Sequence, residues 1–437
     1  MFKFLGKKNI KKLLASKLAK SSGIYTLSDI IKKAIPFLLL PVLTRYLTPA
    51  DYGIIAMFFV VLGLVNPFTG LGIKSAIFRT YFKKGDIDFD QYVSNGVLIL
   101  ISSSSLVLLL FVVFSSFISE YSGIPESWIP FIVIISAGQF IHTIVLAIWQ
   151  AKYEYNKYGF FNILVTALNL GASIFLIVVL KYNWEGRALG QLIGSVVFCL
   201  VGIIILYRGG YLKFKLNKKY ISHALKFGVP LIPHILSTYI ITMSDRIFLT
   251  NMVGVSETGL YTVGYQIGMI VEVVAAASNK ALTPWFYERL NEGKSIAKKK
   301  IVKISYLYVF SIITFSLFLS LAGPLMIKIF VSKDFYSATK FIFWVALGYA
   351  FKSGYYMVAT YINYLEKTHI LSWMTFFVGV LNILLNYFFI KILGSVGAAV
   401  ATTVSYFSQF ILVWMISMKL YPMPWFSFIE KKKSRKQ

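Results

Sequence analysis

Long apolar runs dominate the chain and predict transmembrane helices rather than the short amphipathic elements of a soluble domain. Each run holds about 18 to 26 mainly apolar residues between glycine, proline or charged positions, which is the length that crosses a bilayer as an α-helix. The runs predict helices near residues 22–47, 52–73, 93–118, 127–150, 158–180, 186–207, 224–250, 259–283, 301–323, 338–363, 369–390 and 396–418. The expected fold class is an all-α multi-pass membrane protein with about 12 transmembrane helices.

Lysine and arginine alternate between the loops as membrane topology requires. An even number of spans puts both termini on one side, and cytoplasmic loops collect basic residues. On the side of the termini the loops carry Lys74, Arg79, Lys83, Lys84, Lys152, Lys157, Arg208, Lys213, Lys215, Lys218, Lys219, Arg289, Lys294, Lys298, Lys299, Lys300 and Lys367. The opposite loops hold Lys181, Arg187, Lys328, Lys333 and Lys391. Both termini are therefore predicted to be cytoplasmic, as a basic segment 1–21 and a basic tail 421–437.

Composition supports this interpretation. The 437 residues are 57% hydrophobic and 14% charged, with a mean hydropathy of +0.72, which leaves no room for a sizeable soluble domain. The net charge of +27 would suggest nucleic-acid binding in a soluble protein, but here the basic cytoplasmic loops explain it. The one cysteine, Cys199, lies inside an apolar run, so the chain has no disulfide framework and no cysteine-based metal site.

The two halves of the chain echo each other. Residues 168–190 and 381–401 share the pattern L-N-x-x-x-[SN], an apolar stretch, and then G-x-A-x-[GA], in which small residues allow close helix packing. A second echo relates Leu47–Gly53 to Val255–Tyr261, at the start of the second helix of each half. Six helices in each half would make the halves parallel repeats, as in many secondary transporters.

Several of these segments resemble bacterial polysaccharide flippases of the Wzx type, in the multidrug/oligosaccharidyl-lipid/polysaccharide exporter superfamily. The resemblance is carried by 227–233 (FGVPLIP), 244–249 (SDRIFL), 259–261 (GLY), 40–49 (LPVLTRYLTP) with Tyr52-Gly53, and the L-N-x-x-x-N and G-A-A motifs. It implies two six-helix lobes, residues 22–212 and 213–420, that form a V-shaped central cavity. It also implies export of an undecaprenyl-diphosphate-linked glycan to the periplasmic leaflet by alternating access.

Ionisable residues in the first helix are candidates for the cavity, since charges within spans are costly and usually face a cavity or a partner. The apolar run 34–44 is too short to cross the bilayer, so this helix must extend back through Asp29, Lys32 and Lys33. Asp29 and Lys33 are spaced i, i+4 and could form a local ion pair. Lys32 could instead extend to the cytoplasmic interface. At the outer end of the same helix, Arg45 either binds cargo or anchors the helix.

The tenth helix places Lys352 near mid-membrane, with Tyr349 and Tyr356 on the same face. Tyrosine hydroxyls can bond to sugar hydroxyls, and an ammonium attracts a diphosphate. We therefore predict that this face binds substrate. The alternative is that Glu272, near the middle of the eighth helix, neutralises Lys352 in an ion pair.

Asp245 and Arg246 occur late in the seventh helix, in the family-like S-D-R segment. Adjacent residues on a helix point in different directions, so one is expected to reach the lumen and the other a lobe contact. Their expected role is structural or gating, with direct ligand contact as the alternative. Lys280, at the inner end of the eighth helix, either binds cargo or anchors the helix. Two histidines within spans, His142 and His234, either relay protons or are packed polar residues.

The sequence therefore favours a lipid-linked oligosaccharide flippase for O-antigen, capsule or a related polysaccharide, in the bacterial inner membrane. A multidrug exporter of the same superfamily is the alternative, although cationic drugs call for buried carboxylates or aromatic cages. A membrane enzyme is not expected, because no acid/base or nucleophile constellation is present. No cofactor or metal is expected, and a proton or sodium gradient is the expected energy source. The expected partners are the lipid-linked glycan, membrane lipids and the polysaccharide polymerase machinery, with the protein a monomer that binds no nucleic acid.

Overall fold

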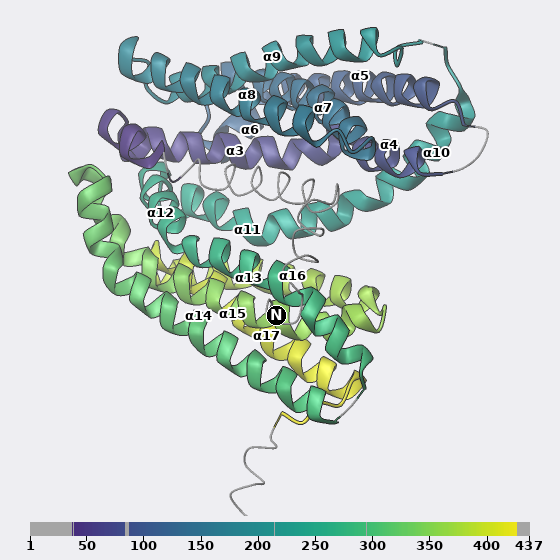
Figure 1. The fold of residues 1–437 in the computed structure, drawn as a ribbon. Coiled ribbons are helices and arrows are strands. Elements are labelled where there is room, and N and C mark those ends of the chain that lie inside the picture. The colour runs from purple at the N-terminus through teal and green to yellow at the C-terminus, as the bar shows by residue number, and fades with distance from the viewer. Residues whose placement is uncertain (1–36, 38, 84–86, 214, 294, 426–437) are drawn as a thin grey trace, which may run out of the picture. The chain divides into compact units, whose positions relative to one another are not determined.

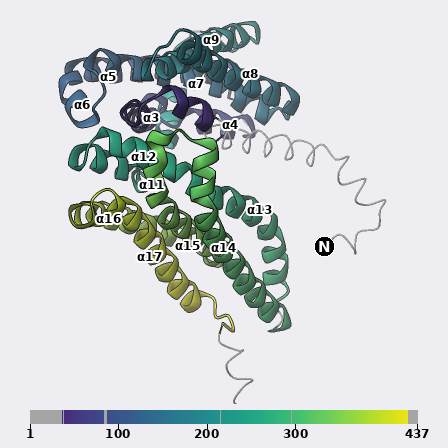
Figure 2. The ribbon, with the colours of Figure 1, turned by 90° about the vertical axis from the view of Figure 1, so that its left-hand side faces the viewer.

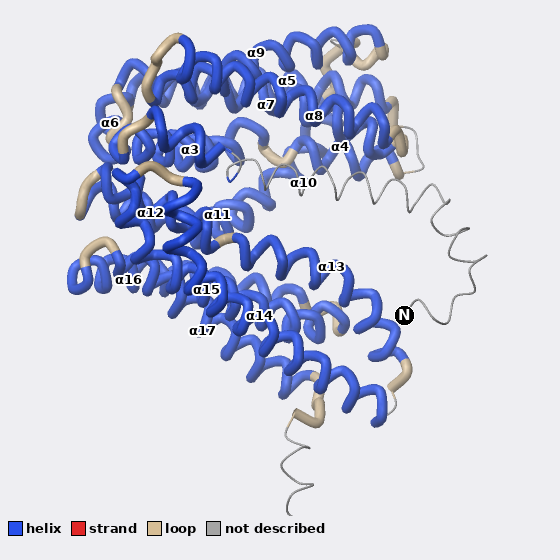
Figure 3. Tube along the Cα trace, turned by 60° about the vertical axis from the view of Figure 1, so that its left-hand side comes forward, coloured by secondary structure: helices blue, strands red, loops and turns tan. Residues whose placement is uncertain are grey.

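The structure is a computed structural model that describes residue 37 and residues 39–83, 87–213, 215–293 and 295–425. In this part of the chain every regular element is helical, and Figure 3 shows helices joined by loops. The prediction of an all-α fold is thus confirmed. The first predicted span, 22–47, lies mostly outside the described residues.

The chain divides into two compact units. The first contains the described residues up to Leu47 and those from Ile54 to Leu236. Its helices, labelled in Figure 1, are α3 (Pro49–Gly70), α4 (Ile73–Tyr81), α5 (Phe89–Val113), α6 (Ser115–Ser122), α7 (Ile129–Ala151), α8 (Tyr155–Ile174), α9 (Trp184–Arg208) and α10 (Lys218–Gly228). Short turns η1 (Glu126–Trp128), η2 (Phe175–Val179) and η3 (Val229–Leu231) complete it. Its core includes Ile73 and Ile77 of α4, Tyr92 and Val93 of α5, and Ile144 of α7.

The second unit contains the described residues from Ser237 onward together with Thr48–Gly53. Its helices are α11 (Ile232–Met252), α12 (Val255–Gly268), α13 (Ile270–Asn291), α14 (Ser295–Phe330), α15 (Thr339–Tyr364), α16 (Thr368–Leu393) and α17 (Val396–Leu420), with the short turn η4 (Lys333–Ala338) before α15. The central helix is α15, which packs against α12, α13, α14 and α17. Figure 2 shows α14, α15 and α17 side by side.

Residues 213–236 group with the first unit, although the sequence assigned them to the second lobe. The reason is local packing. Helix α10 lies against α4 and α5, and Asn217 is held from α5 because its backbone N–H donates to the Asn95 side chain at 2.9 Å. A Cβ on Gly228 would lie 2.0 Å from the Leu71 carbonyl oxygen, so the end of α10 touches the backbone before α4.

Helices suited to cross a membrane account for most of both units. In the described residues nine segments are long and apolar enough to span a bilayer, and Lys218–Leu231 with Ile235–Met252 would form one more as a bent pair. They include Val255–Asn291, which the sequence predicted as one span and which the structure divides into α12 and α13. Helix α15 is not among the nine, because tyrosines, Lys340 and Lys352 lower its hydropathy. Its neighbours in the second unit bury it instead.

The echoed motifs near the ends of the two halves form similar helix pairs. Helix α8 packs against α9, and α16 packs against α17. A Cβ on Gly190 of α9 would lie 2.6 Å from the backbone nitrogen of Ser173, and one on Gly397 of α17 would lie 2.2 Å from the Phe389 carbonyl oxygen. The predicted close packing at these small residues is therefore confirmed within each unit.

The other echoed pair, Leu47–Gly53 and Val255–Tyr261, meets inside the second unit. A Cβ on Gly53 would lie 1.9 Å from the Val255 carbonyl oxygen, and one on Gly259 would lie 1.9 Å from the Pro49 carbonyl oxygen. Gly259 lies 206 positions after Gly53, and Val255 lies 206 positions after Pro49. The two contacts are therefore equivalent. Only glycine allows the first turns of α3 and α12 to approach this closely.

Candidate functional site

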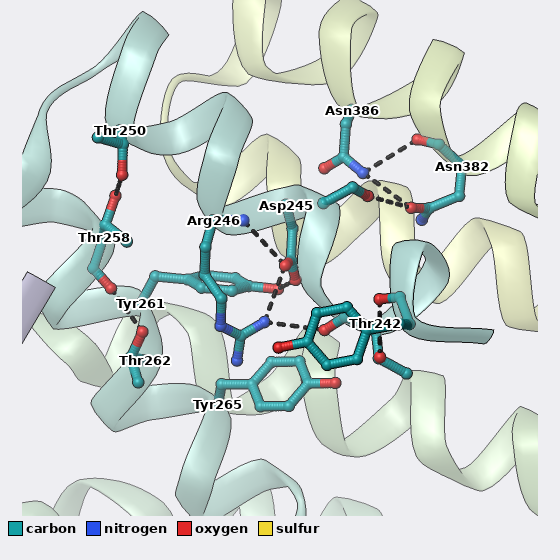
Figure 4. A network of polar contacts seen from close by, with 12 residues as sticks. Thr242, Asp245, Arg246, Thr250, Thr258, Tyr261, Thr262, Tyr265, Asn382 and Asn386 are labelled. Carbon is teal, nitrogen blue, oxygen red and sulfur yellow. Dashed lines mark hydrogen bonds and ion pairs between the residues drawn. The ribbon is translucent and has the colours of Figure 1, made fainter. Parts of the chain in front are cut away.

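The first part of the site is a buried ion pair on α11. The Arg246 Nη1 lies 2.8 Å from the Asp245 Oδ1, and the two side chains are 5% and 1% exposed. The same nitrogen donates to the Thr242 carbonyl at 3.1 Å, and the Tyr261 hydroxyl donates to Asp245 Oδ2. Figure 4 shows the guanidinium between Asp245 and the ring of Tyr265, whose centroid is 4.2 Å away.

The expectation that Asp245 and Arg246 point in different directions is wrong. Adjacent Cβ atoms do diverge on a helix, but the long arginine side chain folds back so that its guanidinium reaches the neighbouring carboxylate. Asp245 Oδ1 also accepts the backbone N–H of Arg246 at 2.9 Å. Burial favours this arrangement, since an unpaired charge in a low-dielectric interior is costly.

The second part of the site is the ion pair between Lys352 and Glu272. The Lys352 ammonium lies 3.5 Å from Glu272 Oε1, and the side chains are 20% and 13% exposed. The Tyr356 hydroxyl donates to the same carboxylate oxygen at 2.8 Å. The ammonium lies 5.2 Å from the ring centroids of both Tyr349 and Tyr406 and 6.0 Å from that of Tyr356. Lys352 thus occupies a tyrosine cage that also contains its counter-ion.

A row of tyrosines connects the two ion pairs. Tyr265, beneath Arg246, has its hydroxyl 2.6 Å from the hydroxyl of Tyr349, beside Lys352. Tyr349 in turn packs on Tyr406 with ring centroids 5.8 Å apart. Four helices, α11, α12, α15 and α17, supply the row and the α11 ion pair, and α13 adds Glu272. We call Asp245, Arg246, Tyr261, Tyr265, Glu272, Tyr349, Lys352, Tyr356 and Tyr406 the tyrosine cluster.

Charge in the tyrosine cluster is balanced, with two cations and two carboxylates. The cluster therefore carries no excess of positive charge for a diphosphate. What it offers is hydroxyl groups, aromatic faces and two polarised ion pairs. Only Glu272, Lys352 and Tyr356 of the cluster keep part of their surface exposed. At these three residues, an anion would compete with Glu272 for Lys352.

The remaining predicted site residues lie elsewhere. Arg45 is exposed on the helical segment 39–46, and Lys280 is exposed on α13. Asp29, Lys32 and Lys33 fall outside the described residues. Sequence reasoning missed Tyr265 and Tyr406 as site residues. Tyr265 follows Tyr261 by four positions, so the G-L-Y motif pointed to its helix face, whereas no local signal identified Tyr406.

Asn382 and Asn386 of the echoed L-N-x-x-x-N motif have a structural role beside the cluster. Asn382 accepts a hydrogen bond from Ser244 and donates to Ser405, both at 3.1 Å. Asn386 donates to the Asn382 side chain at 3.0 Å. These buried bonds join α11, α16 and α17, so the L-N-x-x-x-N motif positions the helix that carries Asp245 and Arg246 (Figure 4).

Comparison with known proteins identifies the family. Residues 18–289 match the model of the polysaccharide biosynthesis protein family, and the chain belongs to that family. A protein of Haemophilus influenzae described as an uncharacterized membrane protein is 28% identical over 399 residues, covering 89% of this chain and 92% of the relative. A second protein from that organism, named for the Lsg locus, is 26% identical over 295 residues, covering 65% of this chain and 69% of the relative.

Solved structures of transporters share the fold. The lipid II flippase MurJ in an inward closed conformation superposes with a TM-score of 0.72 at 16% identity, over 92% of this chain and 87% of MurJ. An inward-facing multidrug resistance MATE family transporter of the MOP superfamily gives a TM-score of 0.70 at 17% identity, over 89% of this chain and 94% of the transporter. The chain is therefore a multi-pass membrane protein with the fold of MOP-superfamily transporters.

Proposed function

We propose that this protein is a flippase that moves an undecaprenyl-diphosphate-linked oligosaccharide from the cytoplasmic to the periplasmic leaflet of the bacterial inner membrane. The observation that carries the proposal is the family match over residues 18–289, on a chain whose fold is that of MOP-superfamily transporters. The glycan would serve O-antigen, capsule or related polysaccharide synthesis.

The mechanism we propose is alternating access without covalent catalysis. The prenyl chain stays in lipid while the polar head group passes through the protein, so the protein must offset the desolvation of sugar hydroxyls and phosphates. The partly exposed members of the tyrosine cluster, Glu272, Lys352 and Tyr356, support this role because they place charged and hydroxyl groups inside helices that are otherwise apolar. We propose a monomer with no cofactor, driven by a proton or sodium gradient, that hands its product to the polymerase machinery.

The orientation we propose has both termini in the cytoplasm. It is supported by the basic loops on one side, among them the exposed Lys83, Lys152 and Lys213. Anionic head groups at that surface would attract these side chains.

Deletion in the native host tests the function. The leaflet that carries the lipid-linked oligosaccharide is measured by access of a membrane-impermeant glycan-modifying enzyme to spheroplasts. We expect the oligosaccharide to become inaccessible after deletion and accessible again when the wild-type gene is restored. Unchanged access in the deletion strain would reject the flippase proposal.

A multidrug exporter is the second candidate, and the Lys352–Glu272 cage is the observation that favours it. A carboxylate among three tyrosines is the chemistry that recognises an organic cation, provided that Lys352 is displaced. The same deletion strain distinguishes the two functions. Normal glycan display with increased sensitivity to cationic drugs would favour the exporter.

A further inference from the structure

The first unit contains a polar pocket that the tyrosine cluster does not include. It has a volume of about 390 Å³ and lies between α7, α8 and α9. Its polar walls include Gln139 and Thr143 of α7, Thr166 and Asn169 of α8, and Arg187 and Gln191 of α9. None of the described residues that line it is acidic. Its size falls within the range of roughly 300–1,000 Å³ found for small-molecule sites.

The polar residues of this pocket lie at a depth where side chains usually contact hydrocarbon. All three helices are segments that are able to span a membrane. Gln139 is ten residues beyond Ile129, where α7 begins, and Asn169 is fourteen beyond Tyr155, where α8 begins. At 1.5 Å per residue these positions lie roughly 15 and 21 Å along their helices, within the hydrocarbon region. Polar side chains at such depth face protein, water or cargo rather than lipid.

Another hollow in the same unit gives an apolar comparison. It has a volume of about 730 Å³ and is lined almost entirely by apolar side chains of α3, α5 and α10, such as Leu64, Phe68 and Leu106. Acyl chains can fill that hollow without loss of hydrogen bonds. The pocket between α7, α8 and α9 cannot be filled in this way, because its amides and hydroxyls would lose their polar partners.

Hydrogen bonds fix part of the wall and leave donors at its surface. Arg187 Nη1 donates to Asn169 Oδ1 at 2.7 Å and to Ser173 Oγ at 2.9 Å, with its guanidinium 5.0 Å from the Phe59 ring centroid. The Asn169 amide donates to Gln191 Oε1. Gln191 therefore keeps an amide NH₂ for other partners, and the Gln139 side chain makes no hydrogen bond within the described part of the chain.

We propose that this pocket is a subsite for a sugar unit of the lipid-linked glycan. Amides and hydroxyls both donate and accept, as sugar hydroxyls do, and the two glutamines and two threonines surround a volume suited to a compact polar ligand. Arg187 presets Asn169 and Gln191 through the bonds above, so the wall is organised before the ligand arrives. The absence of carboxylates among the described lining residues makes acidic sugars acceptable as well. This inference rests on the proposed flippase function.

Binding by the purified full-length protein tests the subsite. The probes are the lipid-linked oligosaccharide extracted from the host strain that lacks the protein, and undecaprenyl diphosphate without sugar. We expect Gln139→Leu and Gln191→Leu each to weaken binding of the glycan-bearing lipid about fivefold, the effect of one lost hydrogen bond. Binding of the sugar-free lipid should stay unchanged. Gln150→Leu, the same substitution on α7 outside the pocket, is the matched control.

The outcomes separate the subsite from the function on which it rests. If the wild-type protein binds neither lipid, the subsite and the flippase proposal both fail. If it binds the two lipids equally, the subsite alone is rejected. If the wild type prefers the glycan-bearing lipid and both leucine variants keep that preference, the subsite alone is rejected. Gln139 makes no hydrogen bond within the described residues, so its leucine variant should fold, and a thermal melt identical to that of Gln150→Leu verifies this.

Accessibility gives a second measurement. In a Cys199→Ser background, Gln139→Cys should react with a charged thiol reagent, because a cargo pocket must admit water, and the extracted glycan-bearing lipid should slow that reaction. An unreactive Gln139→Cys would mean that other parts of the chain fill the pocket, which would overturn the proposal.

Discussion

At the residue scale, Lys352 and Glu272 are energetically linked. Each is mostly buried, and each removes the cost of the other's charge because the ammonium and carboxylate lie 3.5 Å apart. Removing one partner leaves the other charge buried without compensation, whereas removing both leaves a neutral pair of amides. The ion pair was the alternative that the sequence offered for Lys352. Because of it, a neutral Lys352 variant changes protein stability as well as any contact with substrate.

Variants of this pair should therefore be non-additive. We expect Lys352→Gln and Glu272→Gln each to lower the free energy of unfolding by about 3 kcal/mol, and the double variant to lose much less than the sum. Thermal unfolding of purified protein in detergent measures this. Lys352→Arg, which keeps the charge, is the matched control and should lose less stability than Lys352→Gln. Strict additivity of the two single effects would contradict the linkage.

Local sequence rules predict some members of the tyrosine cluster and not others. Lys352 stands out in the sequence because it is a cation inside an apolar run, and Tyr349 and Tyr356 follow from helical periodicity. Tyr406 cannot be found in this way, since it reaches Lys352 only because α15 packs on α17. The direction of Arg246 was predicted wrongly, because side-chain length and burial outweighed the angular spacing of adjacent residues.

At the element scale, glycine determines how closely the first turns of α3 and α12 approach. A Cβ at position 259 would lie 1.9 Å from the Pro49 carbonyl oxygen and 2.9 Å from the Gly53 nitrogen, and both are backbone atoms that cannot rotate away. The equivalent position 53 meets the Val255 carbonyl oxygen at the same distance. The sequence revealed the repetition of these segments but not that the two copies touch, because a repeat specifies likeness rather than contact.

Gly259→Ala should consequently destabilise the second unit by roughly 1–3 kcal/mol, the usual cost of overpacking. Gly171→Ala is the control, since no atom lies within 4 Å of a Cβ built there on α8. Replacing a helical glycine by alanine at an open position is expected to be neutral or stabilising by up to about 1 kcal/mol. Both are compared with wild type by thermal unfolding in detergent. Equal stability of the two variants would show that the contact between the two first turns is not tight.

The start of α5 carries a charge-dependent cap. Asp88 is the N-cap residue and accepts the Gln91 backbone N–H at 3.1 Å, while Lys213 contacts its carboxylate at 3.0 Å. These contacts, first the backbone hydrogen bond and then the lysine, hold the pKa of Asp88 below its ordinary value of 3.8. A lowered carboxyl pKa means that its contribution to stability is present above 3.8 and is lost as pH falls through the folded-state value.

Asp88→Asn should therefore make unfolding less sensitive to acid. Asparagine also caps helices well, so the helix start is retained while the titrating charge is removed. We expect the melting temperature of wild type to exceed that of the variant near pH 7, with the difference vanishing as the pH falls below 3.8. Melts across this pH range measure it. A difference that persists in acid would show that the charge of Asp88 does not stabilise the cap.

At the scale of the whole molecule, most helices were predictable because an apolar run of sufficient length has few alternatives to a spanning helix. The predicted spans between residues 52 and 418 each coincide with a helix or a helix pair. What could not be predicted is the break at Met269 between α12 and α13, where the sequence has no proline. The low hydropathy of α15 is also explained only by its neighbours, since burial by α12, α13, α14 and α17 replaces contact with lipid.

Topology is the property of the whole chain that follows from the loops between these helices. From the alternation of the spans, we predict that the connections at 152–154 and 365–367 face the cytoplasm and that those at 180–183 and 394–395 face the other side. In a Cys199→Ser background, we expect Lys181→Cys and Ser395→Cys to react with an impermeant thiol reagent added outside spheroplasts. Lys152→Cys and Glu366→Cys should react only after the membrane is permeabilised.

This labelling pattern is decisive because the predicted topology places one of these loops from each unit on each side of the membrane. Lys152 and Lys181 flank α8 with its turn η2 in the first unit, and Glu366 and Ser395 flank α16 in the second. If the two units are parallel repeats, the equivalent loops must label alike. Opposite labelling of Lys181→Cys and Ser395→Cys would require an odd number of spans between them, and would rule out both the parallel repeat and the placement of the two termini on one side.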